Sequence, residues 1–336
     1  MRQSNLKRLI ILGFQLVNQR GISRYSCKYS KKTFTQHQFL VLGVLKTYLK
    51  MDYRTFNDWL IFSREACIPI KLKRMPHFTT LQKFMQRFNT ALFDTLISAV
   101  FSQIAAANRP VDAAVDGSGF TSSYCSRYFV MRINRETSYR SFMKMPIAVD
   151  PKSKALLAVK CRKGPSHGTK DFIPLLRKAD RSVSQRIRNV IADKAYDSSR
   201  NFCFIEKELH ADAIIPLRNY RSRTIGRHTI RRHRPLDPNR EIYGRRNIAE
   251  TVFSVIKRKF GGDLRSRLTE VKKKEMKLKA FTYNLMILTK KKSYFFVVGF
   301  LQSQKKRTFK YVLCLLISVL RDYCMLGQKR QAKLRR

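Results

Sequence analysis

The stretch YGRRNIAETVFSVIK, residues 243–257, has the periodicity of an amphipathic helix. At about 100° per residue, four of its polar side chains fall within about 60° of one another; they are Tyr243, Arg246, Glu250 and Lys257. The opposite side carries an apolar stripe that is typical of a helix packed on a core, formed by Ile248, Val252, Val255 and Ile256. We therefore predict one helix over residues 243–257. Its polar face is either solvated, with Arg246 and Glu250 paired at i,i+4 spacing, or part of a functional site.

The charge of the chain indicates a polyanionic partner. The 336 residues contain 70 Lys and Arg against 22 Asp and Glu, a net charge of +48. Such an excess favours salt-sensitive binding to nucleic acid. A hydrophobic content of 44% is enough for a folded core and excludes global disorder. The composition alone does not distinguish a DNA enzyme from a ribosomal or chromatin protein.

Several features favour a cytoplasmic, nucleoid-associated protein without a membrane partner. The seven cysteines are scattered and include no Cys-x2-Cys pair, so neither a disulfide framework nor a zinc cluster is indicated. The first 20 residues lack the pattern of a signal peptide. The apolar runs 294–301 and 311–320 are too short to span a bilayer.

The first 108 residues are predicted to be helical. Thr35 and Gln38 have the spacing of a capping box, Asp52 can cap the next helix, and Thr79 and Gln82 repeat the box before a long helical segment that ends near Ala107. A basic connector with two prolines, residues 68–77, separates them. This arrangement fits a helix-turn-helix-like DNA-binding module, and an ordinary helical subdomain fits it nearly as well.

After Pro110 the periodicity changes to alternating strands and helices. Strands are predicted at 113–116, 145–149, 155–159, 190–193 and 213–217, with helices at 171–178 and 199–209. The order β-β-β-α-β-α-β-α, completed by the helix 243–257, predicts an α/β fold with a mixed sheet flanked by helices.

Two of these strands end in aspartate. Asp116 and Asp193 would lie at the carboxyl edge of neighbouring strands, the usual place for α/β active sites, and Glu250 could supply a third carboxylate. Three converging carboxylates suit two divalent cations, Mg²⁺ above all, and phosphodiester chemistry. A single Asp at a strand end is commonly a cap or turn residue, so the joint placement carries the prediction. Asp197 is the alternative for the second carboxylate, although its position favours capping of the helix from Ser199.

The spacing Tyr243-x2-Arg246-x3-Glu250-x6-Lys257 resembles, without a gap, the signature around the catalytic Glu of the DDE transposases of prokaryotic insertion sequences. Residues 115–118 (VDGS) resemble the first-Asp strand of that family, and residues 192–197 (ADKAYD) resemble its second-Asp motif. Residues 76–88 are similar to the amino-terminal region of the same group. The resemblance extends over about residues 113–285.

The resemblance implies a ribonuclease H-like catalytic domain over residues 109–290, an all-α DNA-binding region over 1–108, and a basic and apolar tail over 291–336. Asp116, Asp193 and Glu250 would be the catalytic, metal-binding residues, with Mg²⁺ as the cation and Mn²⁺ as a substitute. The DNA-binding residues would be Tyr243, Arg246 and Lys257. The implied reaction is Mg²⁺-dependent cleavage at the ends of an insertion sequence, followed by strand transfer into target DNA, with double-stranded DNA (terminal repeats and target) as the partner of a homodimer.

Two other classes remain open on sequence grounds. One is an inactive or domesticated transposase-derived DNA-binding protein, for which loss of a carboxylate would be the sign; all three are present. The other is a resolvase-like or repair nuclease, which would lack the Tyr-Arg-Glu-Lys helix. The basic stretch 218–234 is predicted to contact phosphates, or to be a solvated loop in the absence of DNA.

Overall fold

The computed structural model describes residues 4–105, 109–122, 142–164, 169–218 and 239–292. The chain divides into two compact units, Met1–Thr289 and Lys290–Arg336, and the fold below is that of the first. Most of the basic stretch 218–234 and of the tail 291–336 lies outside the described residues. The predicted domain boundaries at 108 and 290 stay predictions.

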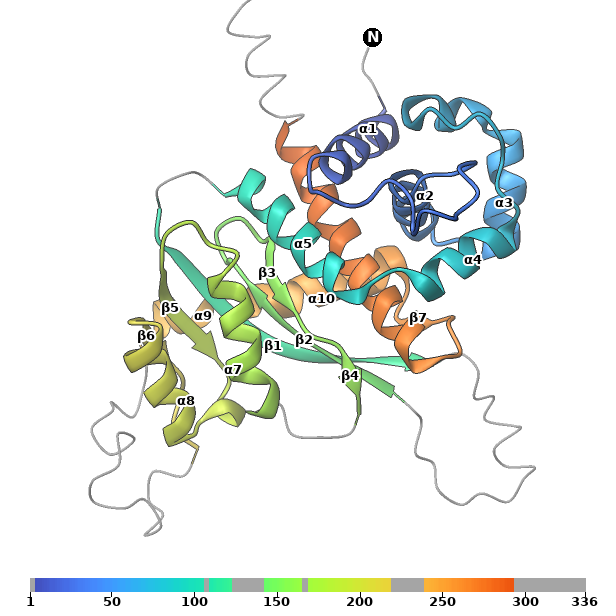
Figure 1. The fold of residues 1–336 in the computed structure, drawn as a ribbon. Helices are drawn as coiled ribbons and strands as arrows, with labels where there is room; N and C mark the ends of the chain where they lie inside the picture. The colour runs from blue at the N-terminus through green and yellow to red at the C-terminus, as the bar shows by residue number, and fades with distance from the viewer. Residues whose placement is uncertain (1–3, 106–108, 123–141, 165–168, 219–238, 293–336) are drawn as a thin grey trace, which may run out of the picture. The chain divides into compact units, whose positions relative to one another are not determined.

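The amino-terminal region is helical (Figure 1). Its elements are α1 (Asn5–Asn18), α2 (Gln36–Tyr48), α3 (Tyr53–Phe62), η1 (Arg64–Ile70), α4 (Phe78–Arg87) and α5 (Thr90–Ile104). The predicted capping box at Thr35 is confirmed, because Thr35 Oγ1 accepts from the Gln38 N–H (3.1 Å) and Gln38 Oε1 accepts from the Thr35 N–H (2.9 Å). Asp52 caps α3 as expected.

Two details of the helical prediction were wrong. The repeated capping box at Thr79 does not form, because His77 is the N-cap of α4 and its ring accepts from the Thr79 N–H. The long helix predicted up to Ala107 is two helices. Asn89 separates them: its side-chain oxygen accepts from the Ala91 N–H (2.9 Å) and starts α5.

The sheet is mixed, as predicted. Its strands are β1 (Val111–Ser122), β2 (Phe142–Val149), β3 (Leu156–Val159), β4 (Arg162–Lys163), β5 (Ile187–Ala192), β6 (Asp212–Ile214) and β7 (Asp263–Leu264). They follow the order β3-β2-β1-β5-β6, with β4 beside β2 and β7 beside β1. β1 runs antiparallel to β2 and parallel to β5. Helix α7 (Thr169–Asp180) packs on β2 and β3, and α10 (Asn247–Phe260) packs on the other face against β1 and β2 (Figure 1). The fold is a ribonuclease H-like α/β fold preceded by helices.

The first strand is longer than predicted. It does not end near Asp116 but continues to Ser122. The reason is that every residue of β2 pairs with β1, from Ala114–Val149 to Thr121–Phe142. On its other edge the pairing with β5 stops at Val115–Ala192. Asp116 is therefore in mid-strand on one edge of β1 and at the end of the ladder on the other.

The helix predicted over 243–257 is interrupted. It consists of α9 (Arg240–Gly244) and α10, with Arg245 and Arg246 in a turn between them. The Arg246 N–H donates to the Tyr243 carbonyl (3.0 Å) and the Ala249 N–H to the Arg246 carbonyl (2.9 Å), an i to i−3 pattern tighter than an α-helix. Gly244, the last residue of α9, is a poor helix former. The apolar stripe is confirmed, since Val252 and Ile256 are buried.

The other predicted elements between Asp150 and Leu217 exist within a few residues of their expected bounds. Helix 171–178 is α7, and helix 199–209 is α8 (Ser199–Cys203) followed by a wider turn over Phe204–Glu208. No helix of the described residues is long and apolar enough to cross a membrane.

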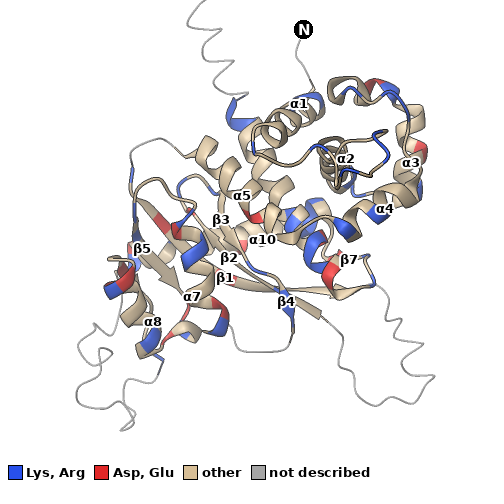
Figure 2. Ribbon diagram, in the orientation of Figure 1, with Lys and Arg blue, Asp and Glu red and all other residues tan. Residues whose placement is uncertain are grey.

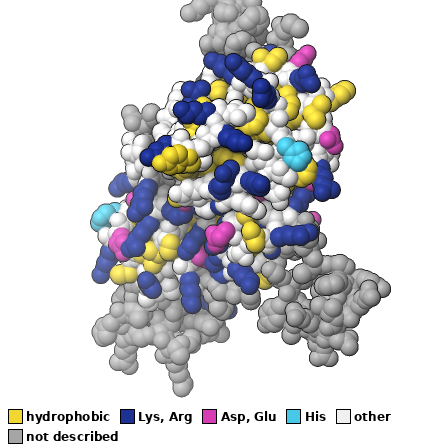
Figure 3. Space-filling view, turned by 45° about the vertical axis from the view of Figure 1, so that its right-hand side comes forward, with side chains coloured by type: hydrophobic (Ala, Val, Ile, Leu, Met, Phe, Trp, Pro, Cys, Tyr) yellow, Lys and Arg dark blue, Asp and Glu magenta, His cyan; other side chains and the backbone are white. Residues whose placement is uncertain are grey.

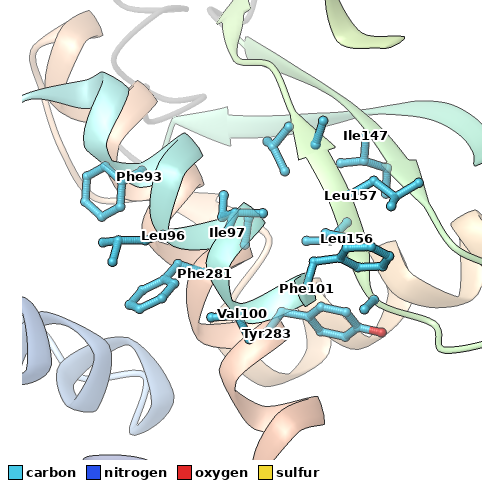
Figure 4. Close-up of a cluster of buried hydrophobic side chains, with 14 of the residues drawn as sticks. Phe93, Leu96, Ile97, Val100, Phe101, Ile147, Leu156, Leu157, Phe281 and Tyr283 are labelled. Atoms are coloured by element: carbon cyan, nitrogen blue, oxygen red, sulfur yellow. The ribbon is translucent and has the colours of Figure 1, made fainter. Parts of the chain in front are cut away.

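The central core joins the helical region to the sheet (Figure 4). It is built by α5, by β2 and β3, and by a helix over residues 269–292. The buried side chains drawn there include Phe93, Leu96, Ile97, Val100, Phe101, Ile147, Leu156, Leu157, Phe281 and Tyr283. Because this core is shared, the sheet and the amino-terminal helices form one unit.

Four lysines of the helix 269–292 are buried, which the charge count gave no reason to expect; they are Lys272, Lys274, Lys277 and Lys279. Three of them bond to carbonyls of other segments: Lys277 Nζ donates to the Thr90 carbonyl at the start of α5 (3.2 Å), and the other two bond near the carboxyl ends of helices. Lys274 Nζ donates to the Gln86 carbonyl near the end of α4 (2.5 Å). Lys279 Nζ donates to the carbonyls of Gly261 (2.8 Å) and Asp263 (2.7 Å), just beyond α10. Cations favour these carbonyls because the helix dipole is negative there.

Lys279 gives a testable pH dependence. Its side chain lines a cavity of about 90 Å³. Burial lowers the pKa of Lys279 to about 8; the charge of Glu275 opposes this shift and the charge of Lys46 adds to it. Asp263 and Arg265 are the other charged groups that act on it. The unfolded chain keeps this proton up to about pH 10.5. Because the unfolded state binds more protons between these values, the free energy of unfolding rises with pH in this window.

Between pH 7 and pH 10, we expect the free energy of unfolding of wild type to increase by about 2 kcal/mol relative to that of Lys279→Met. Urea unfolding of both proteins at the two pH values measures it. Lys259→Met, at an exposed position of α10, is the control and should show no such change. A difference between wild type and Lys279→Met that stays constant with pH would contradict the prediction.

Candidate active site

Asp116 and Asp193 are brought side by side by the register of the sheet. The parallel ladder of β1 and β5 ends at Val115 and Ala192, so the next residue on each strand is one of these aspartates. The pKa of Asp116 is raised, chiefly by burial. The Gly117 N–H, 2.8 Å from Asp116 Oδ1, and the charge of Arg246 oppose the rise, while the charges of Glu250 and Asp193 add to it. The two aspartates therefore lie within electrostatic reach of each other and of Glu250.

Asp193 and Asp197 have different surroundings. Asp193 is the N-cap of a short turn over Lys194–Tyr196 and accepts from the Lys194 N–H (2.7 Å). Asp197 accepts from the Arg218 N–H (2.9 Å). The prediction that Asp197 caps the next helix was wrong, because Ser198 is the N-cap of α8. Asp197 instead joins the end of this turn to the segment that follows β6.

Glu250 forms an ion pair with Arg246 (2.9 Å). The i,i+4 pairing considered from the sequence is therefore present. Arg246 is also held close to the other carboxylates: burial lowers its pKa, yet neighbouring negative groups, Glu250 first, outweigh this and the net direction is up. Its Nε is buried and has no hydrogen-bond partner among the described residues. The guanidinium thus keeps an unused donor beside three acids.

The remaining two residues of the predicted polar face lie at its two ends. The Tyr243 ring is 5.9 Å from Arg246 Cζ, so Tyr243, Arg246 and Glu250 form a contacting series in spite of the turn between α9 and α10. Lys257 is farther along α10, where its Nζ donates to Ser118 Oγ (2.7 Å). Ser118 is two residues beyond Asp116 on β1. Lys257 is therefore tied to the strand that carries Asp116.

A family model described as "Transposase DDE domain" matches residues 111–285, just over half of the chain. The chain belongs to this family. No curated protein shows a significant match to it. Among solved structures, a cryo-EM structure of the piggyBac transposase synaptic complex with hairpin DNA is similar over 86% of this chain and 73% of that one, at 11% identity and a TM-score of 0.40. A likeness this low supports no detail of the site.

The carboxylates of this transposase DDE domain fit a divalent cation by their chemistry. Carboxylate oxygens are the ligands that Mg²⁺ and Mn²⁺ prefer, and the charges of Glu250 and Asp193, which add to the raised pKa of Asp116, provide negative charge for a cation to neutralise. Among the described residues, no three His, Cys, Asp or Glu side chains converge into a ready metal-binding group. Glu250 is turned to Arg246, and its side chain is 56% exposed.

The site also contains residues that the sequence did not single out. Tyr196 is buried, with its ring 4.9 Å from that of Phe172 on α7. Its pKa is raised by burial first and then by Asp116, so its hydroxyl remains a neutral group beside the first aspartate. Lys144 on β2 lies over Gly117. The Lys-Ala-Tyr-Asp motif pointed to Tyr196, but only the strand register reveals Lys144.

Proposed function

We propose that the chain is a transposase that cuts DNA at the ends of an insertion sequence and transfers the freed 3′-hydroxyl to target DNA. The observation that carries the proposal is the placement of Asp116 beside Asp193, with Glu250 within electrostatic reach, in a chain of net charge +48. Neighbouring carboxylates repel one another, and a bound divalent cation would relieve that repulsion.

The proposed roles follow from side-chain chemistry. Asp116, Asp193 and Glu250 hold Mg²⁺, for which Mn²⁺ substitutes. When bound, the cations stabilise negative charge on the attacking and leaving oxygens of the phosphodiester. Arg246 offers a planar fork to a DNA phosphate and Lys257 a point charge. Tyr243 positions the DNA next to Arg246.

The proposed partner is double-stranded DNA, both terminal repeats and target, bound by a homodimer in the cytoplasm at the nucleoid. Lys and Arg are spread over the helical region and the sheet (Figure 2), and on one face they far outnumber Asp and Glu (Figure 3). Such a surface attracts DNA whatever its sequence. The helices α1 to α5 are the candidates for recognition of the element ends.

The test is Mg²⁺-dependent cleavage of a plasmid that carries the gene with its flanking DNA. We expect wild type to nick or break the element boundaries, EDTA to abolish the cuts, and Glu250→Gln to be inactive because one metal-binding charge is lost. Glu241→Gln is the matched control: it removes an exposed carboxylate of α9 that also pairs with an arginine, Arg245, and should cut like wild type.

Two outcomes would overturn the proposal. Cleavage by Glu250→Gln at the wild-type rate would exclude the assigned role of this residue. Tight DNA binding by wild type and Glu250→Gln alike, with no cleavage by either, would identify an inactive or domesticated DNA-binding protein.

A further inference from the structure

Lys144 lies on the face of the sheet that α7 covers, across β1 from Glu250. In the strand ladders it is directly opposite Gly119 of β1 and Arg162 of β4, and directly opposite residues of antiparallel strands share a face. Arg162 identifies this face as the one that α7 covers, because its guanidinium bonds to Asp171 of α7. We call this side the α7 face; the polar series from Tyr243 to Lys257 lies on the α10 face.

Glycines of β1 leave room for the Lys144 side chain. A Cβ built on Gly117 would lie 3.3 Å from Lys144 Cε and 3.7 Å from Tyr196 Oη. The aliphatic stem of Lys144 therefore crosses β1 at Gly117, the residue next to Asp116. A Cβ on Gly119 would lie 3.5 Å from the Phe142 ring. Any larger residue at 117 would push the lysine away from this point.

The neighbouring cations share a carboxylate partner, whereas the Lys144 ammonium has none among the described residues. Lys160 (2.9 Å) and Arg162 both pair with the buried carboxylate of Asp171. The ammonium of Lys144 has no hydrogen bond or ion pair to any of the described residues, and the residue is half-buried. A lysine with a packed stem and an unpaired ammonium presents its charge in a defined place. Here that place is at Gly117 of β1, the residue that follows Asp116.

We propose that Lys144 binds a backbone phosphate of the substrate DNA beside the phosphodiester that reacts. The inference rests on the proposed function and deepens it: Arg246 and Lys257 hold the strand from the α10 face, and Lys144 holds it from the α7 face. A lysine suits this task because its ammonium meets a phosphate as a point charge, without a fixed plane.

The test uses Lys144→Met, which keeps an unbranched stem over Gly117 and removes only the charge, and Lys144→Arg, which restores the charge. Lys163→Met is the matched control. Lys163 is exposed on β4, and because it is opposite Met143 its side chain points to the other face. Each protein is titrated with a fluorescent duplex that carries one element end, at several salt concentrations, and its cleavage rate is measured in Mg²⁺.

We expect Lys144→Met to bind the duplex about tenfold more weakly and to lower the slope of log K against log salt by about one. Lys144→Arg should keep the wild-type slope, and Lys163→Met should change it little. Equal losses in Lys144→Met and Lys163→Met would show general attraction and overturn the inference. The inference is also overturned if wild type cleaves and Lys144→Met binds the duplex as tightly as wild type does. If wild type binds but never cuts, the proposed function fails while the salt slope still decides the role of Lys144.

Discussion

Replacing Asp193 with asparagine is expected to lower DNA cleavage by about 1,000-fold, because one carboxylate of the metal-binding set is lost. DNA binding should persist or strengthen, since a negative charge leaves the site. Asp197→Asn, four residues later, should cut at nearly the wild-type rate, because Asp197 bonds to the Arg218 N–H and an asparagine oxygen can accept the same bond.

The pair of variants decides which aspartate is the second carboxylate. Single-turnover cleavage of a duplex carrying an element end measures the rate, and titration of the same duplex without Mg²⁺ measures binding. If Asp197→Asn were the inactive variant and Asp193→Asn the active one, the assignment based on the β1–β5 register would be wrong.

The second large effect concerns stability. Asn284 is fully buried in the helix 269–292 and bonds to the backbone of β3: its Oδ1 accepts from the Leu156 N–H and its Nδ2 donates to the Leu156 carbonyl, both at 2.8 Å. β3 is the last strand of the ladder, so this amide stands in for a neighbouring strand. Asn284→Leu keeps the branched shape, with a somewhat larger volume, but leaves two buried backbone groups without partners.

We expect Asn284→Leu to lower the free energy of unfolding by about 3 kcal/mol. Urea unfolding monitored by circular dichroism measures it. Thr282→Val is the control in the same helix: Thr282 is also fully buried, but its hydroxyl bonds only within the helix, to the Leu278 carbonyl. A loss for Asn284→Leu no larger than that of the control would show that the bonds to Leu156 contribute little.

Local patterns predicted the elements of this fold well. The order of strands and helices, the caps at Thr35 and Asp52, and the apolar stripe of α10 depend on residues near one another in sequence, and all are confirmed. Asp116 and Asp193 could be paired in advance because both follow apolar strand segments, and parallel strands present their carboxyl ends at one edge.

What could not be predicted depends on partners far along the chain. β1 continues past Asp116 because β2 pairs with it there. The turn at Arg245 and Arg246 interrupts a helix whose periodicity is otherwise continuous. The position of Lys144 follows only from a register that places it opposite Gly119, from where its side chain reaches Gly117. Such features require knowledge of which strands are neighbours and how they are aligned.

The buried lysines of the helix 269–292 limit what a charge-removal scan of this protein can reveal. Lys274 and Lys279 bond to carbonyls of other segments inside the molecule, so they are structural components and not contacts for a ligand. Substitutions that remove their hydrogen-bond donors would lower the amount of folded protein, and the weaker DNA retention would then be misread as a lost contact. A map of the DNA path must therefore start from accessible cations, and each variant must be shown to fold before its affinity is compared.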